Sequence, residues 1–141
     1  ITTRLVGSEM CIRDRSSSES VRKFCYELLK DSTTEEAHVL FLDQNLNFVG
    51  ESQISQGSPN SVDLDLHDIV IKSVRTSCTK IILTHSHPHG VLLPSSADIA
   101  STRRAASALN SIGIELIDHI IVNEEDSYSM RTAGMLPDIW F

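Results

Sequence analysis

The sequence has few cysteines and no long apolar run. Its three cysteines, Cys11, Cys25 and Cys78, are odd in number and widely spaced, with no Cys-x-x-Cys pair. This pattern argues against a disulfide framework and a thiolate metal site, and it predicts a reducing, cytoplasmic location. No apolar run approaches the ~18 residues that cross a bilayer, so a membrane-spanning role is not expected.

Basic residues are also scarce. Twelve Lys and Arg stand against nineteen Asp and Glu, which gives a net charge of −7. A surface of this charge repels phosphate backbones unless its basic residues cluster. Nucleic acid is therefore not an expected partner.

No internal repeat or low-complexity segment is recognised in the sequence, and residues 1–16 lack the charged-then-apolar pattern of a secretory signal. Residues 1–16 show neither a helical nor a strand period, and we expect a disordered or artefactual leader there. The rest of a 141-residue chain fits one domain with a real core, so we predict a single domain over residues 17–141.

Apolar periodicity predicts alternating helices and strands. The predicted helices span residues 17–30, a segment capped by Ser61 or Asp63 that runs to about residue 77, and residues 96–112. The predicted strands span residues 37–42, 47–56, 80–84, 114–122 and 128–131. This order indicates an α/β fold, a three-layer α/β/α domain with a mixed central sheet, whose ligands collect beyond the carboxyl ends of the strands.

Three of the six histidines lie in one pentapeptide, His85-Ser86-His87-Pro88-His89, at such a strand end. In an extended chain His85 and His87 face the same way, so two imidazoles can converge on one ion. His89 continues the alternation and is a further candidate ligand, although Pro88 and the following glycine are expected to turn the chain there.

A carboxylate at the start of the next helix completes a candidate metal site. The loop before this helix can fold back and bring Asp98 beside His85 and His87. Two histidines and one carboxylate leave the fourth position of Zn²⁺ for water, as in catalytic zinc sites. Ser95, three residues before Asp98, forms a capping pattern that would fix the helix start and orient the carboxylate.

The base for a zinc-activated water is less specified by the residues themselves. Glu35 and Glu36 stand immediately before the first buried strand, which can neighbour the histidine strand. They can supply the base or simply solubilise a loop. Asp118 and His119 face opposite ways if their strand is regular, and we expect one in the core and the other on a hydrogen-bond partner.

The spacing HxHx₇Sx₂D, formed by His85, His87, Ser95 and Asp98, resembles the JAMM (MPN+) metallopeptidase family. The segments THSHPHG, SADIASTRRA and GIELIDHIIVN are similar to the RadC-like branch, over residues 17–134. RadC-like chains usually read HNHPSG, so this chain differs at Ser86 and His89. The helix-hairpin-helix region expected before such a domain is not recognised here, so we do not carry over the family's association with DNA repair.

The resemblance implies a function as well as a fold. It implies Zn²⁺ held by His85, His87 and Asp98, a glutamate as general acid/base, and Ser95 steadying a tetrahedral oxyanion. Glu35 aligns best with that glutamate, and Glu36 one residue away is the alternative. The implied reaction is hydrolysis of a peptide or isopeptide bond in a peptide or protein substrate.

Two other functions are weighed against this one. Zinc nucleoside deaminases share the layering but need HxE and PCxxC, whereas His87 stands at the glutamate position and no CxxC is present. A non-enzymatic RadC-like module for DNA repair or protein interaction would be indicated by a missing ligand, and no ligand is missing. The sequence predicts neither the physiological substrate nor the oligomeric state.

Overall fold

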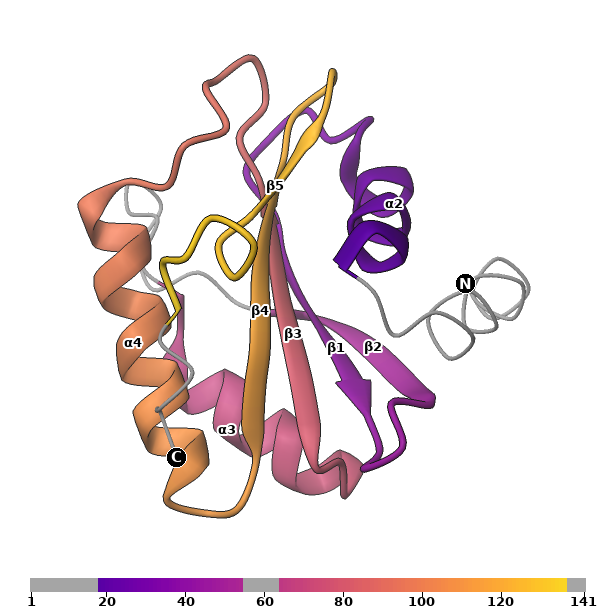
Figure 1. Cartoon of the computed structure of the whole chain (residues 1–141), viewed down its shortest axis with the longest axis vertical. Helices are drawn as coiled ribbons and strands as arrows, with labels where there is room; N and C mark the ends of the chain where they lie inside the picture. Colours follow the sequence, from indigo (N-terminus) through magenta and orange to yellow (C-terminus); the bar gives the residue numbers. More distant parts are fainter. Residues whose placement is uncertain (1–17, 55–63, 137–141) are drawn as a thin grey trace.

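A five-stranded mixed sheet lies between helices on both of its faces (Figure 1). The computed structural model describes residues 18–54 and 64–136. Their elements, in chain order, are α2 (Ser18–Leu29), β1 (Ala37–Leu42), β2 (Phe48–Ile54), α3 (Leu66–Thr76), β3 (Lys80–Ser86), α4 (Ser96–Asn110), β4 (Glu115–Val122) and β5 (Ser127–Ser129). The predicted α/β/α fold is confirmed.

The strand order is β2-β1-β3-β4-β5. β1 pairs antiparallel with β2 and β3, and β5 pairs antiparallel with β4. β3 and β4 are parallel, as expected for two strands joined through a helix. Their carboxyl ends therefore meet at one edge of the sheet, where the chain leaves β3 toward α4.

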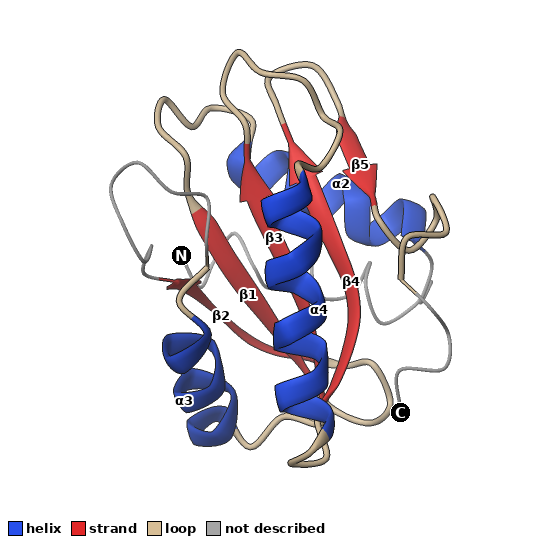
Figure 2. Cartoon of the chain, turned by 90° about the vertical axis from the view of Figure 1, so that its left-hand side faces the viewer, coloured by secondary structure: helices blue, strands red, loops and turns tan. Residues whose placement is uncertain are grey.

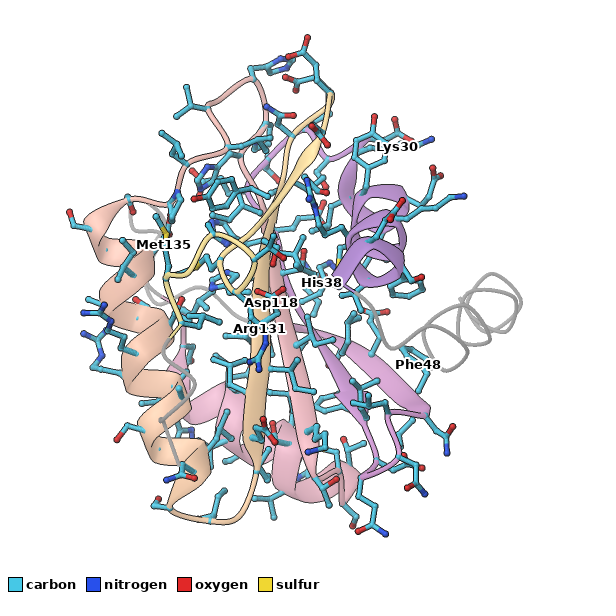
Figure 3. All side chains as sticks on the ribbon, in the orientation of Figure 1. Lys30, His38, Phe48, Asp118, Arg131 and Met135 are labelled. Carbon is cyan, nitrogen blue, oxygen red and sulfur yellow. The ribbon has the colours of Figure 1, made fainter. Side chains whose placement is uncertain are left out.

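The side of the sheet covered by α2 carries one of two apolar clusters. Residues of β1, β3 and β4 alternate between the faces, and those on this side meet the apolar stripe of the helix. Phe24 of α2 packs edge to face against Phe48 of β2, with ring centroids 5.7 Å apart (Figure 3 labels Phe48). The cluster comprises Val21, Phe24, Cys25, Leu29, Leu40, Leu42, Ile82, Ile120 and Val122.

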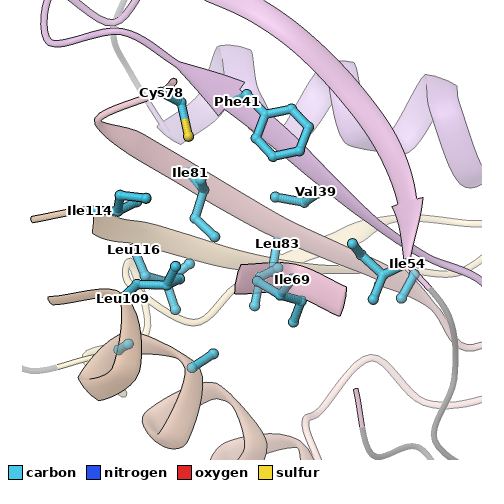
Figure 4. Close-up of a cluster of buried hydrophobic side chains, with 13 residues drawn as sticks. Val39, Phe41, Ile54, Ile69, Cys78, Ile81, Leu83, Leu109, Ile114 and Leu116 are labelled. Atoms are coloured by element: carbon cyan, nitrogen blue, oxygen red, sulfur yellow. The ribbon is translucent and has the colours of Figure 1, made fainter. Parts of the chain in front are cut away.

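The other side of the sheet is covered by α3 and α4, which lie next to each other in front of the strands (Figure 2). Val39, Phe41, Ile81 and Leu83 point from the sheet toward Ile69 (Figure 4). From α4, Ala105, Ala106 and Leu109 belong to the same cluster. The small alanine side chains let the helix approach the sheet closely.

Several predicted boundaries are corrected by the structure. α3 begins at Leu66, later than a cap at Ser61 or Asp63 predicts, because Asp65 accepts the N–H of Asp68 at 3.2 Å. β3 extends through residue 86 instead of ending at 84, and α4 ends at residue 110 instead of 112.

The last strand occupies residues 127–129 instead of 128–131. The predicted leader, residues 1–16, lies outside the described residues, as do Ser61 and Asp63. Within the described ranges, no helix has the length and apolar character needed to cross a membrane.

Candidate metal centre

Two histidines leave the carboxyl end of β3 on the same face of the sheet. His85 is still in the strand, opposite Ile121 of β4. The His87 N–H donates to the Val122 carbonyl oxygen at 2.8 Å, which keeps the chain extended past the last residue of β3. Residues two apart in an extended chain face the same way, so the two imidazoles converge.

Asp98 reaches these histidines from the first turn of α4. Its N–H donates to Ser95 Oγ at 3.0 Å, and its Oδ2 accepts the Ser95 N–H at 2.8 Å. The predicted capping box is confirmed, with Ser95 as the N-cap. Because Asp98 is only 2% exposed, the cap fixes a buried carboxylate at the edge of the sheet.

The distances among these three side chains fit a metal ion. His85 Nε2 lies 2.8 Å from His87 Nε2, and each lies 3.5 Å from one oxygen of Asp98. A tetrahedral ion with nitrogen and oxygen ligands at ~2.0–2.2 Å keeps neighbouring ligand atoms about 3.3 Å apart. His85, His87 and Asp98 could therefore hold a metal ion, and among the described residues they are the group that meets this geometry.

A chain of hydrogen bonds fixes which nitrogen of His85 faces the ion. Thr102 Oγ1 donates to the Asp98 carbonyl oxygen at 2.6 Å, so it accepts from Nδ1–H of His119 at 2.6 Å. His119 Nε2 is then an acceptor, and it receives Nδ1–H of His85 at 2.7 Å. The lone pair of His85 is thereby placed on Nε2, toward Asp98.

His87 is oriented by the loop that follows it. Its Nδ1–H donates to the carbonyl oxygen of Val91 at 2.8 Å, which leaves the lone pair on Nε2. The Nε2 lone pairs of His85 and His87 thus face each other across 2.8 Å. Two lone pairs at this distance repel unless a proton or a cation lies between them.

The charges at the site also favour a cation. Burial alone would raise the pKa of Asp98, but when a proton occupies Nε2 of His85 or His87 that nitrogen donates to the carboxylate, and these hydrogen bonds hold the pKa of Asp98 well below its usual range. The bond to Asp98 raises the pKa of His87, against burial, and the Val91 carbonyl adds to the effect. Burial, followed by the nearby His85, lowers the pKa of His119, which keeps its ring neutral.

Glu35 and Glu36 make contacts on different sides of β1. Glu36 Oε1 lies 3.2 Å from His38 Nε2, and His38 also contacts Glu51 of β2. Glu35 instead lines a cleft of ≈460 Å³ together with His87, and its charge raises the pKa of that histidine.

The cleft is also lined by the loop after His87 and by Ser95. Its lining residues are Thr33, Thr34, Glu35, His87, Pro88, His89, Gly90, Val91 and Ser95. The side chain of His89 is 86% exposed, its backbone has a φ of 59°, and its N–H donates to Glu124 Oε2 at 2.9 Å. The ring of His89 therefore lies outside the group of His85, His87 and Asp98, as the expected turn at Pro88 predicts.

Asp118 and His119 point to opposite faces of β4. The Asp118 carboxylate accepts the Ser129 hydroxyl and, at 2.9 Å, the Arg131 N–H, which ties β5 and the following turn to β4 (Figure 3). Both side chains are buried, and His119 as well as Asp118 is hydrogen-bonded, so the residue that faces the core also has polar partners. Sequence reasoning missed Thr102, although its place four residues after Asp98 puts both on one helix face.

Comparison with known proteins identifies the family. A family model described as the RadC-like JAB domain matches residues 15–135. The chain is 33% identical over 118 residues to a UPF0758 protein of Bordetella avium, covering 84% of this chain and 52% of that protein. For a UPF0758 protein of Finegoldia magna the identity is 35% over 133 residues, covering 89% and 59%.

A UPF0758 protein of Photobacterium profundum is 32% identical over 121 residues, covering 86% of this chain and 54% of that protein. The chain thus spans about half the length of the curated relatives it matches. It belongs to the RadC-like JAB domain family, and the resemblance noted in the sequence is confirmed.

Proposed function

We propose that this RadC-like JAB domain is a zinc-dependent metallopeptidase or isopeptidase that hydrolyses a peptide or isopeptide bond in a peptide or protein substrate. The observation that carries the proposal is the 2.8 Å separation of two Nε2 atoms whose lone pairs converge beside the Asp98 carboxylate. Two nitrogens and one oxygen suit Zn²⁺ and leave a fourth position open.

The residues around this position have the chemistry that hydrolysis needs. Zn²⁺, when bound by His85, His87 and Asp98, supplies a Lewis acid that polarises a carbonyl group and lowers the pKa of water. Glu35 takes a proton from the water as its oxygen attacks the carbonyl carbon. The same carboxyl group then gives that proton to the departing amine nitrogen as the carbon–nitrogen bond breaks.

Ser95 is suited to stabilise the oxyanion that this attack creates. Its hydroxyl oxygen already accepts the Asp98 N–H, and the hydroxyl keeps its own proton for donation. Ser95 and Glu35 line the same cleft as His87. A preorganised donor at a developing negative charge is among the larger contributions to catalysis.

Metal content and hydrolysis test the proposal together. We expect about one zinc per chain by mass spectrometry of the purified protein, and loss of that zinc in His87→Ala. His67→Ala is the matched control, because His67 is an exposed histidine of α3, and it should retain the metal. A folded wild-type protein that takes up no zinc would contradict the site.

Activity should be screened on fluorogenic peptides and on lysine Nε-linked isopeptides, with and without a chelator. We expect chelator-sensitive cleavage by the wild type and zinc-loaded but inactive Glu35→Gln. Glu36→Gln is the matched control and should remain active. Reversed results would assign the base to Glu36. A zinc-loaded wild type that cleaves none of these substrates would favour the non-enzymatic module.

A further inference from the structure

Ser86, the residue between the two histidines, points away from them. It is only 1% exposed, and its side chain contacts the segment that carries Glu35. We propose that Ser86 is a positioning residue that holds the Glu35 carboxylate at the metal centre, an inference that rests on the proposed hydrolase function.

Three hydrogen bonds join Ser86 to this segment. The Ser86 N–H donates to the Glu36 carbonyl oxygen at 2.9 Å, and the Glu36 N–H donates to Ser86 Oγ at 3.0 Å. The Ser86 hydroxyl donates in turn to the Thr34 carbonyl oxygen at 3.3 Å. The hydroxyl therefore binds the backbone on both sides of Glu35.

These bonds replace the regular ladder at the point where β1 begins. β1 and β3 are antiparallel with Ala37 opposite His85, so Glu36 and Ser86 would ordinarily exchange two backbone hydrogen bonds. One of the two is present, but the Glu36 N–H turns to the Ser86 hydroxyl instead of the carbonyl. The chain thus leaves the sheet at Glu36, and the side chain of Ser86 sets the direction in which it leaves.

That direction places the two glutamates. Residues 32–36 form neither helix nor strand, so the backbone around Glu35 is not held by a regular element. We call the three hydrogen bonds of Ser86 to Thr34 and Glu36 the Ser86 clamp. With this clamp in place, Glu36 contacts His38 on one side and Glu35 lines the cleft with His87 on the other. Without the hydroxyl, two backbone groups lose a buried partner and the segment is free to shift.

The test compares Ser86→Ala with Ser86→Thr, which restores a hydroxyl. Displacement of a reacting group by about 1 Å can reduce the rate by about 100-fold, so we expect kcat of Ser86→Ala to fall about 10- to 100-fold. KM on the best peptide or isopeptide of the screen should change less than about twofold, with one zinc still bound, since the groups that contact substrate and metal are unchanged. Ser86→Thr should recover most of the loss.

Ser73→Ala is the matched control. Ser73 is a buried serine of α3 whose hydroxyl donates to the Ile69 carbonyl oxygen at 2.7 Å, remote from the cleft. Its kcat should equal that of the wild type. If Ser86→Ala does not fold, Ser86→Cys offers the same comparison, because a thiol is a weak donor and acceptor of similar shape.

Amide hydrogen exchange separates the clamp from the chemistry. The Glu36 amide should be protected in the wild type and should exchange about tenfold faster in Ser86→Ala, as expected for the loss of one hydrogen bond. This measurement needs no substrate. If the wild type has no hydrolytic activity, the proposed function is contradicted, but the exchange rate of the Glu36 amide still tests whether the Ser86 hydrogen bonds hold the segment. Unchanged kcat, unchanged Glu36 exchange, or loss of zinc from Ser86→Ala would each overturn the positioning role.

Discussion

His119 Nε2 accepts a hydrogen bond from His85 Nδ1 at 2.7 Å, so a residue of β4 decides which nitrogen of a β3 histidine is available to a metal ion. Thr102 and the Asp98 carbonyl oxygen complete this chain from α4. Partners of this kind fix the tautomer and the ring orientation of a ligand, and they raise its basicity. The site is therefore supported from three elements that are distant in sequence.

Substitution of His119 should weaken the metal site without removing a ligand. In His119→Ala, His85 loses its Nδ1 acceptor, and we expect zinc affinity to fall about 10- to 100-fold. Competition with a zinc-sensitive dye measures this change, and Thr102→Val should shift affinity in the same direction. His67→Ala serves as the exposed-histidine control. Equal affinities of His119→Ala and the wild type would show that His85 needs no such support.

Zinc affinity should decrease at acidic pH because of His87. Asp98 raises the pKa of His87 above that of an ordinary histidine, so a proton competes for the ligand nitrogen at a higher pH than usual. Asp98, whose pKa is held low, stays ionised over the same range. We expect the apparent affinity to fall by up to about tenfold per pH unit below the pKa of His87. A flat titration from pH 8 to about 6 would contradict this assignment of charge.

The main features of the fold and the metal group could be predicted from local patterns. The nearly continuous apolar run Ala37–Leu42, interrupted by His38, indicates a buried strand, and the period of two places His85 and His87 on one face. The spacing of Ser95 and Asp98 indicates a capped helix start. Each of these signals is read within a few residues, which is why the sequence predicts them.

Other features depend on contacts that no local pattern encodes. Thr102 reaches His119 only because α4 packs on β4, and Ser86 reaches Thr34 only because β3 lies beside β1. The start of α3 was predicted too early, because the segment before it offers several residues able to cap a helix. In the structure Asp65 is the residue that caps α3, by accepting the N–H of Asp68.

The free energy of unfolding should decrease as pH rises, because of His38, which lies away from the metal centre. Burial alone lowers the pKa of His38, but hydrogen bonds to Glu51 and Glu36 together outweigh it and raise the pKa above its ordinary value. A raised folded pKa gives stability that is fully present below the unfolded pKa and is lost as pH rises through the folded value.

Urea unfolding of the metal-free protein across this pH window measures the effect. The free energy of unfolding should fall from pH 6 toward alkaline pH, and His38→Gln should reduce that slope, leaving the part that comes from His87, whose pKa is also raised in the metal-free protein. His67→Gln is the matched control and should keep the slope. A slope of the same size in His38→Gln would assign the pH dependence to other groups.

Ser95 combines a helix cap with a proposed catalytic donor, and two substitutions separate these roles. Ser95→Ala removes the acceptor of the Asp98 N–H and should lower the free energy of unfolding by about 1 kcal/mol, whereas Ser95→Gly should lower it by only a few tenths. Both variants lack the hydroxyl proton, so both should lose about 100-fold in kcat if it stabilises the oxyanion. Denaturant unfolding and steady-state kinetics on the same preparations compare the two effects. An active glycine variant beside an inactive alanine variant would mean that Ser95 acts through the cap alone, since only the capping strength differs between them.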